Sequence, residues 1–305
     1  MPRSTIYLAN CYTPQPSLAA EEQATATVPR ADDRATHSLR QLRIQSSSSG
    51  ASCSCLVELG HTKVLCQVWA PLYANAPQLP PSIALDMEQG TLHCQVQYAA
   101  QISYPTAAYG ASTASALDGA QASSANNRFT SWIMTRETSL SSSLHTALAA
   151  AVPLEPYPKA CILVQVTVLS DDGSILPTCI LASTVALVKA RVALLDTVTA
   201  CTVAVVVVPY DHENKDKQQQ KQQQSSLQEY WADPTLNESL HAKALVTLCI
   251  MPSSKEVTLW EQTGGALSPQ ETNKAMDLAR DGCRTLQRFV REHILAEFAK
   301  ENEDS

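Results

Sequence analysis

The chain is poor in aromatic residues and in glycine, and it has no long apolar run. Aromatic residues make up 5% of its 305 residues, and only nine residues are glycine. The most apolar stretch, residues 192–209, is interrupted by Asp196 and several threonines, so no run of about 18 uncharged apolar residues occurs. We therefore predict no membrane-spanning segment. The opening residues, Met1-Pro2-Arg3-Ser4, are not followed by the apolar stretch that is typical of a secretion signal.

Several short motifs of enzyme chemistry are also missing. The sequence has no Walker loop and no GxGxxG motif, so we expect no nucleotide cofactor. It has no GxSxG motif, in which many hydrolases carry their nucleophilic serine. The histidines, including His293, show no metal-ligand spacing, and we expect them to be surface or strand residues. The sequence thus predicts neither a cofactor nor a metal site.

Cysteine is abundant, but its placement does not indicate disulfides. Nine of the ten cysteines lie within apolar segments, and no CxxC pair occurs. Cys53 and Cys55 are separated by a single residue, which is not a usual zinc spacing. Because a free cysteine packs as a small hydrophobic residue, we expect reduced thiols in the core, as in proteins of the cytosol or nucleus.

The chain is acidic, with a formal net charge of −7. Binding to nucleic acid requires a basic surface, so this charge argues against a dedicated nucleic-acid-binding protein that acts alone. It is compatible with a subunit that contributes a few arginines to a channel shared with other chains.

The order of the expected strands and helices predicts one α+β domain, in which helices pack on a mixed β-sheet. We expect a disordered tail over residues 1–35, the domain over 36–300, and a short tail over 301–305. Two insertions are predicted, at about 110–127 and at 211–228, the second of which is rich in glutamine.

Periodicity and turn residues predict the elements of this domain. A hairpin with its turn at Gly60-His61 is expected within residues 51–70, and Ser268 is the expected N-cap of the last helix. The other expected strands cover 90–99, 160–169, 198–208, 244–251 and 256–262, and the expected helices cover 128–152, 178–190 and 269–300.

The turn over residues 170–177 connects an apolar strand to an Ala-rich helix. Such a place often holds an anion, because a turn with glycine exposes backbone N–H groups and a helix adds its dipole. Here Ile175 and Leu176 cannot hold a phosphate, and Pro177 has no N–H. The pair Asp171-Asp172 is compatible with acid–base chemistry, but Asp before Gly is common in turns, and we favour a turn.

A second acidic residue, Asp233, precedes Pro234 and Thr235. Two roles are open for it, a metal ligand or general acid on one hand and a turn fixed by the proline on the other. We favour the turn.

Three segments, in order, resemble the RNase PH family of 3′→5′ exoribonucleases. They are Gly50–Cys66, similar to the opening hairpin of the family; Tyr157–Ser174 with its Asp-Gly turn; and the region from Asp233-Pro234-Thr235 to Ala279–Cys283. The resemblance covers roughly residues 36–300, apart from the insertions. It implies the RNase PH-like fold, which is a form of the ribosomal protein S5 domain 2-like fold.

Within the family, the chain resembles the non-catalytic ring subunits of the eukaryotic RNA exosome. Residues 90–99 are similar to the third strand of the component-six subunit type, the mRNA-transport-regulator type, and the component-five type is the alternative. The resemblance implies a place in a six-membered ring with other RNase PH-type subunits and with S1/KH cap subunits. It also implies RNA as a ligand, no membrane, and a location in the nucleus, including the nucleolus, and in the cytoplasm.

The resemblance also implies that the chain is not an enzyme. Active members have Gly-Gly-Thr-Arg at the Asp-Gly turn, where Thr and Arg bind phosphate. This chain keeps Asp172 and Gly173, whereas Ser174, Ile175 and Leu176 replace the Gly, Thr and Arg. We therefore expect a degenerate phosphate site in which no residue is catalytic.

Two further positions follow from the same resemblance. The catalytic aspartate of the family corresponds to Leu245, while Arg136 corresponds to an arginine near the start of the first helix. Arg128 and Arg136 are the candidate RNA-binding residues. Two alternatives remain open, namely an active phosphate-dependent exoribonuclease and a binding module unrelated to RNA.

Overall fold

The computed structural model describes residues 6–7, 30, 32–49, 52–74, 76–81, 83–99, 119–208 and 227–303, with residues 119–131 described at the level of the backbone. Within these ranges the chain forms two β-sheets and four helices. The predicted α+β class is confirmed, with two sheets in place of the single expected sheet.

The first sheet has six strands in the order β1-β2-β3-β4-β6-β5. The β3–β4 hairpin turns at Gly60, as expected, and side chains in β3 alternate between buried and half-buried positions. All pairs are antiparallel except β5 with β6, which makes the sheet mixed. Its strands are β1 (Ile6–Tyr7), β2 (Leu42–Ser49), β3 (Ser52–Leu59), β4 (Thr62–Leu72), β5 (Thr91–Tyr98) and β6 (Cys161–Ser170).

The second sheet has four antiparallel strands in the order β10-β9-β7-β8. They are β7 (Thr199–Val208), β8 (Leu227–Ala232), β9 (Ala244–Met251) and β10 (Glu256–Gly264). The helices are α1 (Gly119–Ala149), α2 (Ile175–Lys189), α3 (Leu236–His241) and α4 (Pro269–Glu303).

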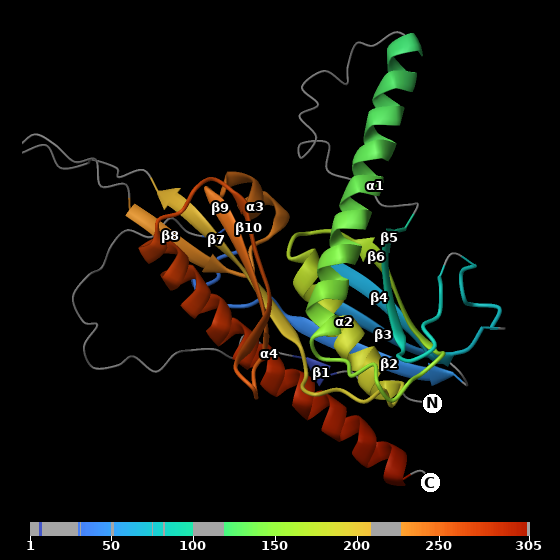
Figure 1. Cartoon of the computed structure of the whole chain (residues 1–305). Coiled ribbons are helices and arrows are strands. Elements are labelled where there is room, and N and C mark those ends of the chain that lie inside the picture. The colour runs from blue at the N-terminus through green and yellow to red at the C-terminus, as the bar shows by residue number, and fades with distance from the viewer. Residues whose placement is uncertain are drawn as a thin grey trace, which may run out of the picture.

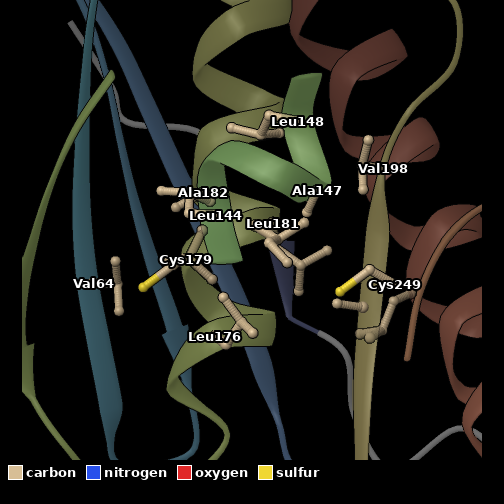
Figure 2. Packing of buried hydrophobic residues seen from close by; sticks show 14 of the residues in the cluster. Val64, Leu144, Ala147, Leu148, Leu176, Cys179, Leu181, Ala182, Val198 and Cys249 are labelled. Atoms are coloured by element: carbon tan, nitrogen blue, oxygen red, sulfur yellow. The ribbon is translucent and has the colours of Figure 1, made fainter. Parts of the chain in front are cut away.

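Helix α2 is the centre of the core. All of its residues from Ile175 to Leu187 are buried, as a helix that is apolar on every side must be in a soluble protein. It packs against β3 and β4 of the first sheet and against β7 of the second (Figure 1). Cys179 points toward Val64 of β4, whereas Leu181 lies on the side of Cys249 (Figure 2). The two sheets therefore share one core through α2.

Helix α4 lies along the second sheet, where it packs on β7, β8 and β9 (Figure 1). Ser268 caps it as expected, because the Glu271 backbone N–H donates to Ser268 Oγ over 3.3 Å. At Gly282 the helix comes so close to β7 that a Cβ would lie 2.6 Å from Cys201 Sγ.

Some expected boundaries were wrong. Helix α1 begins at Gly119, so the second half of the expected insertion at 110–127 is helical; its first half, and residues 211–226, lie outside the described residues. Helix α2 begins at Ile175 instead of residue 178, since a proline is tolerated in the first turn of a helix, where N–H groups have no intrahelical partner. Strand β8 and helix α3 were not expected.

The expected tail over residues 1–35 lies mostly outside the described residues, but its last part packs on the domain. Arg30 is 3% exposed and donates to Glu238 Oε2 over 2.8 Å. Since Ile6–Tyr7 also pairs with β2, parts of the expected tail belong to the folded domain, ahead of the expected boundary at residue 36. Residues 301–303, expected as a tail, continue α4, and 304–305 lie outside the described residues.

Nine cysteines lie in the described residues, and all of them are free and buried. Burial raises the pKa of the Cys66 thiol and of the Cys201 thiol to about 12, so both thiols stay protonated. Across the described part of the chain, no helix is both long enough and apolar enough to span a membrane.

Candidate functional site

The Asp-Gly turn lies between β6 and α2. Hydrogen bonds within the turn and to Thr62 of β4 fix its conformation. The Gly173 N–H donates to Asp171 Oδ1 over 3.1 Å, which is the bond of an Asx turn. The Asp172 N–H donates to Thr62 Oγ1 over 3.1 Å, and the Thr62 hydroxyl donates to the Gly173 carbonyl over 2.7 Å. Asp171 thus acts in the turn, as the favoured interpretation predicted. Burial raises the pKa of its carboxyl.

Gly173 is required at this turn for two reasons. Its φ is +87°, in the region that favours glycine, and a Cβ there would lie 2.7 Å from the Pro234 carbonyl oxygen. The Leu236 N–H donates to the Asp172 carbonyl over 3.0 Å. The start of α3 therefore covers the turn on this side, and little room is left there for a ligand.

Arg40 holds the turn from a second side. Its guanidinium donates to the carbonyl oxygens of Asp172 over 2.7 Å and of Gly173 over 3.2 Å. It also forms an ion pair with Asp233, with Nη2 2.8 Å from Oδ1. Arg40 is 5% exposed. Its charged group therefore binds the turn and is not accessible to an anion from solution.

Asp233 lies in a turn and is paired with a buried arginine. It lies in a turn with φ of +49°, as the favoured interpretation predicted, and its carboxylate binds Arg40. Burial by itself raises the pKa of this carboxyl, but the Arg40 charge and its hydrogen bonds outweigh burial and hold the pKa below the usual value. Thr235, two residues on, caps α3 in a capping box with Glu238.

The first turn of α2 has no side chain suited to bind phosphate. Ile175 and Leu176 are 4% and 6% exposed and belong to the main core cluster, and Leu176 is seen there in Figure 2. Ser174, at the N-cap, turns its hydroxyl to the Pro234 carbonyl over 3.3 Å and makes no cap bond. Pro177 has no N–H to offer.

Leu245, at the expected position of the catalytic aspartate, lies in β9 opposite Ala204 of β7. It packs on a small apolar cluster with Ala204, Val206 and Trp231. A leucine side chain has no group that can gain or lose a proton, so it cannot act as a general acid or base.

Arg136 lies on α1 and is exposed. Its Nε donates to the Tyr98 hydroxyl over 3.2 Å, and its Cζ lies 6.0 Å from the centre of the Trp132 ring. Its charge acts on the carboxyl of Asp171 and opposes the rise in pKa that burial causes. Tyr98 pairs with Val168 of β6, so Arg136 lies near the end of β6 that leads into the Asp-Gly turn. Arg128 belongs to the same helix, and its side chain lies outside the described residues.

One histidine departs from expectation. His293 of α4 is fully buried beside Glu297, with 3.5 Å between Nε2 and Oε1. Its place on the inner face of a long amphipathic helix is the signal that sequence reasoning missed. In the part of the chain that the structure describes, no three His, Cys, Asp or Glu side chains are grouped as metal ligands.

Comparison with known proteins places both halves of the chain in one family. Residues 38–193 match domain 1 of the 3′ exoribonuclease (RNase PH) family, and residues 196–282 match its domain 2. The border between the two matches falls between α2 and β7, where the chain passes from the first sheet to the second.

Curated relatives are similar at low identity. An exosome complex component RRP41-like of Arabidopsis thaliana is 26% identical over 86% of this chain and 83% of its own length. The human exosome complex component MTR3 is 26% identical over 52% of each chain. Rrp41 of Thermoplasma acidophilum is 23% identical over 88% of this chain and 90% of its own.

A solved structure has the same fold. The crystal structure of rice (Oryza sativa) Rrp46 superposes with a TM-score of 0.61 at 18% identity, over 87% of this chain and 100% of that one. At this identity the likeness establishes the fold alone.

Proposed function

Because the chain belongs to the 3′ exoribonuclease (RNase PH) family, we propose that it is a non-catalytic ring subunit of the RNA exosome. In this role it contacts neighbouring subunits and lines the path by which RNA reaches a separate nuclease. The observation that carries the proposal is the buried, apolar first turn of α2, where active members of the family bind phosphate.

The missing side chains account for a large loss of activity. An arginine that binds phosphate makes a charge-assisted and often bidentate contact, worth about 1.5–3 kcal/mol even as a single hydrogen bond to a charged group. Leu176 offers no such contact, and it faces the core. The absence of a general acid at Leu245 removes a further factor of about 10² to 10⁴ in rate. Together these losses support an inactive subunit.

The relatives support the exosome as the assembly. Those reported above carry the name of an exosome complex component, and this is the basis for proposing RNase PH-type neighbours and S1/KH cap subunits as partners. We assign the chain to the component-six type over the component-five type on its strand at residues 90–99. The nucleus, with the nucleolus, and the cytoplasm are the proposed locations.

The exposed side chain of Arg136 supports the proposal that this chain contacts RNA. Arg136 is exposed and is bonded to Tyr98, which pairs with β6 close to the Asp-Gly turn, while Arg40, which binds that turn, is buried in an ion pair. An acidic chain can line an RNA channel if a few such cations are placed on the channel wall.

Two measurements test the proposal. The purified chain is incubated with an oligoadenylate, with and without inorganic phosphate, and the release of nucleoside diphosphates is followed. We expect none, and phosphate-dependent release would establish an active exoribonuclease instead.

The tagged chain is also purified from cells, where we expect RNase PH-type and S1/KH-type chains to accompany it. A monomer-sized native species would contradict the ring.

A further inference from the structure

Helix α1 is fixed in register on the outer strand of the first sheet. The Val96 N–H of β5 donates to Ser141 Oγ over 2.9 Å, and the Tyr98 N–H donates to Glu137 Oε1 over 2.7 Å. Side chains of α1 thus satisfy the backbone of β5. This attachment places Arg136, the neighbour of Glu137, next to the Tyr98 ring at the end of the strand.

The Arg136 side chain is held at two points. The Tyr98 hydroxyl accepts from Nε over 3.2 Å, and the guanidinium carbon lies 6.0 Å from the centre of the Trp132 ring, within the range of a cation–π contact. Tyr98 and Trp132 are half-buried and Arg136 is exposed. The two aromatic side chains therefore restrict an arginine whose charged end faces solvent.

The terminal nitrogens of Arg136 are left for a ligand. Among the described residues, no hydrogen bond or ion pair involves Nη1 or Nη2 of this arginine. A guanidinium offers these two nitrogens as a planar fork, which matches two oxygens of a phosphate group. When its side chain is ordered before binding, less conformational entropy is lost on binding.

We propose that Tyr98 and Trp132 are positioning residues that hold Arg136 for a phosphate group of single-stranded RNA. The proposal rests on the proposed function, in which RNA passes this face of the chain. RNA is favoured over an acidic protein segment because a bound base can in addition stack on the guanidinium plane or on an aromatic ring, and both are present here.

The test measures binding of a fluorescein-labelled oligoadenylate of about 16 nucleotides by fluorescence anisotropy, at several salt concentrations. It uses the full chain, alone and in the complex with which it co-purifies. We expect Arg136→Gln to weaken binding about tenfold and to lower the salt slope by about one, since one phosphate contact is lost. Arg288→Gln is the matched control, because Arg288 is exposed on α4 and has no ion pair among the described residues.

The positioning residues are tested by variants that keep the charge. We expect Tyr98→Phe, which removes only the hydroxyl, and Trp132→Ala each to weaken binding severalfold while the salt slope keeps most of its value. Trp132→Phe retains a ring under the guanidinium, so it restores most of the affinity lost in Trp132→Ala. Thermal unfolding of each variant is measured to check that the chain is still folded.

Several outcomes would overturn the proposal. One is unchanged affinity in Arg136→Gln, or equal losses in Arg136→Gln and Arg288→Gln, which would indicate a general effect of charge. Another is unchanged affinity in both Tyr98→Phe and Trp132→Ala. Loss of a neighbouring subunit with unchanged RNA affinity would make this surface a protein contact. Co-purification of the wild-type chain tests the proposed ring subunit separately. If the chain co-purifies with the ring but gives one of these outcomes, only the role of Tyr98 and Trp132 is contradicted.

Discussion

Arg40 and Asp233, 193 positions apart in the chain, form a buried ion pair with two side-chain hydrogen bonds. Nη2 donates to Oδ1 over 2.8 Å and Nε donates to Oδ2 over 3.0 Å, and both side chains are almost fully buried. The same guanidinium binds the Asp-Gly turn. The segment before β2, the turn before α2 and the turn before α3 are therefore joined at one point.

Removal of one partner of this pair is expected to destabilise the fold strongly. Asp233→Asn leaves the buried Arg40 charge without compensation, which typically costs about 3–5 kcal/mol. The free energy of unfolding, measured in urea, checks this value. Asp277→Asn is the control, because Asp277 pairs with Arg280 on the exposed face of α4 and such pairs contribute about 1 kcal/mol or less. Equal effects of the two substitutions would contradict the role given to Asp233.

The same pair predicts a loss of stability in acid. Although burial alone raises the pKa of Asp233, Arg40 holds it below the usual value, so the unfolded chain, with an Asp pKa of about 3.9, binds the proton more readily than the folded one. The contribution of Asp233 is complete above this pKa and is lost as the pH falls through it toward the lower pKa of the folded state. The free energies of unfolding of the wild type and of Asp233→Asn should therefore converge as the pH falls from about 5 to 2. A difference that is constant over this range would show that the Asp233 charge does not stabilise the fold.

The close approach of α4 to β7 predicts an unusual effect of alanine in a helix. Gly→Ala within a helix usually stabilises by about 1 kcal/mol. At Gly282 the new Cβ would lie 2.6 Å from Cys201 Sγ in a packed core, and overpacking typically costs about 1–3 kcal/mol. We expect Gly282→Ala to be destabilising on its own and much less so together with Cys201→Ala. A double-mutant cycle in urea measures this coupling, and simple additivity would contradict the clash.

Restoring the family arginine at Leu176 is not expected to restore activity. The side chain at this position is 6% exposed within the core, and an unpaired guanidinium there costs at least about 2 kcal/mol. Leu245 still provides no acid. We expect Leu176→Arg to lower the free energy of unfolding and to leave phosphorolysis undetectable, whereas the control Leu176→Met changes stability by less than about 1.5 kcal/mol. A stable Leu176→Arg variant that releases nucleoside diphosphates would contradict this account.

Elements with strong local signals were predicted well from the sequence. The alternation in β3 and β4 with Gly60 between them, and the Ser268 cap of α4, depend on neighbouring residues, and both are found in the structure. The start of α2 was missed because the expected helix began only after Pro177, although a helix accepts proline in its first turn. Strand β8 was missed because it follows directly on a Gln-rich stretch that carries no periodic signal.

The candidate site was predicted in part. The Asp-Gly turn could be read from its residues, but the role of Arg40 depends on contacts with residues more than 100 positions away, which no local pattern indicates. The same holds for Tyr98 and Trp132, whose relation to Arg136 arises only when α1 lies on β5. The long-range partners of these polar side chains could therefore be identified only from the folded structure.

The attachment of α1 to β5 has a consequence for assembly. An outer strand normally offers a row of N–H and C=O groups to which a strand of another chain can be added. At Val96 and Tyr98 these N–H groups are already bound by Ser141 and Glu137 of the same chain. At these two positions, a strand added from another molecule would first have to displace the side chains of α1.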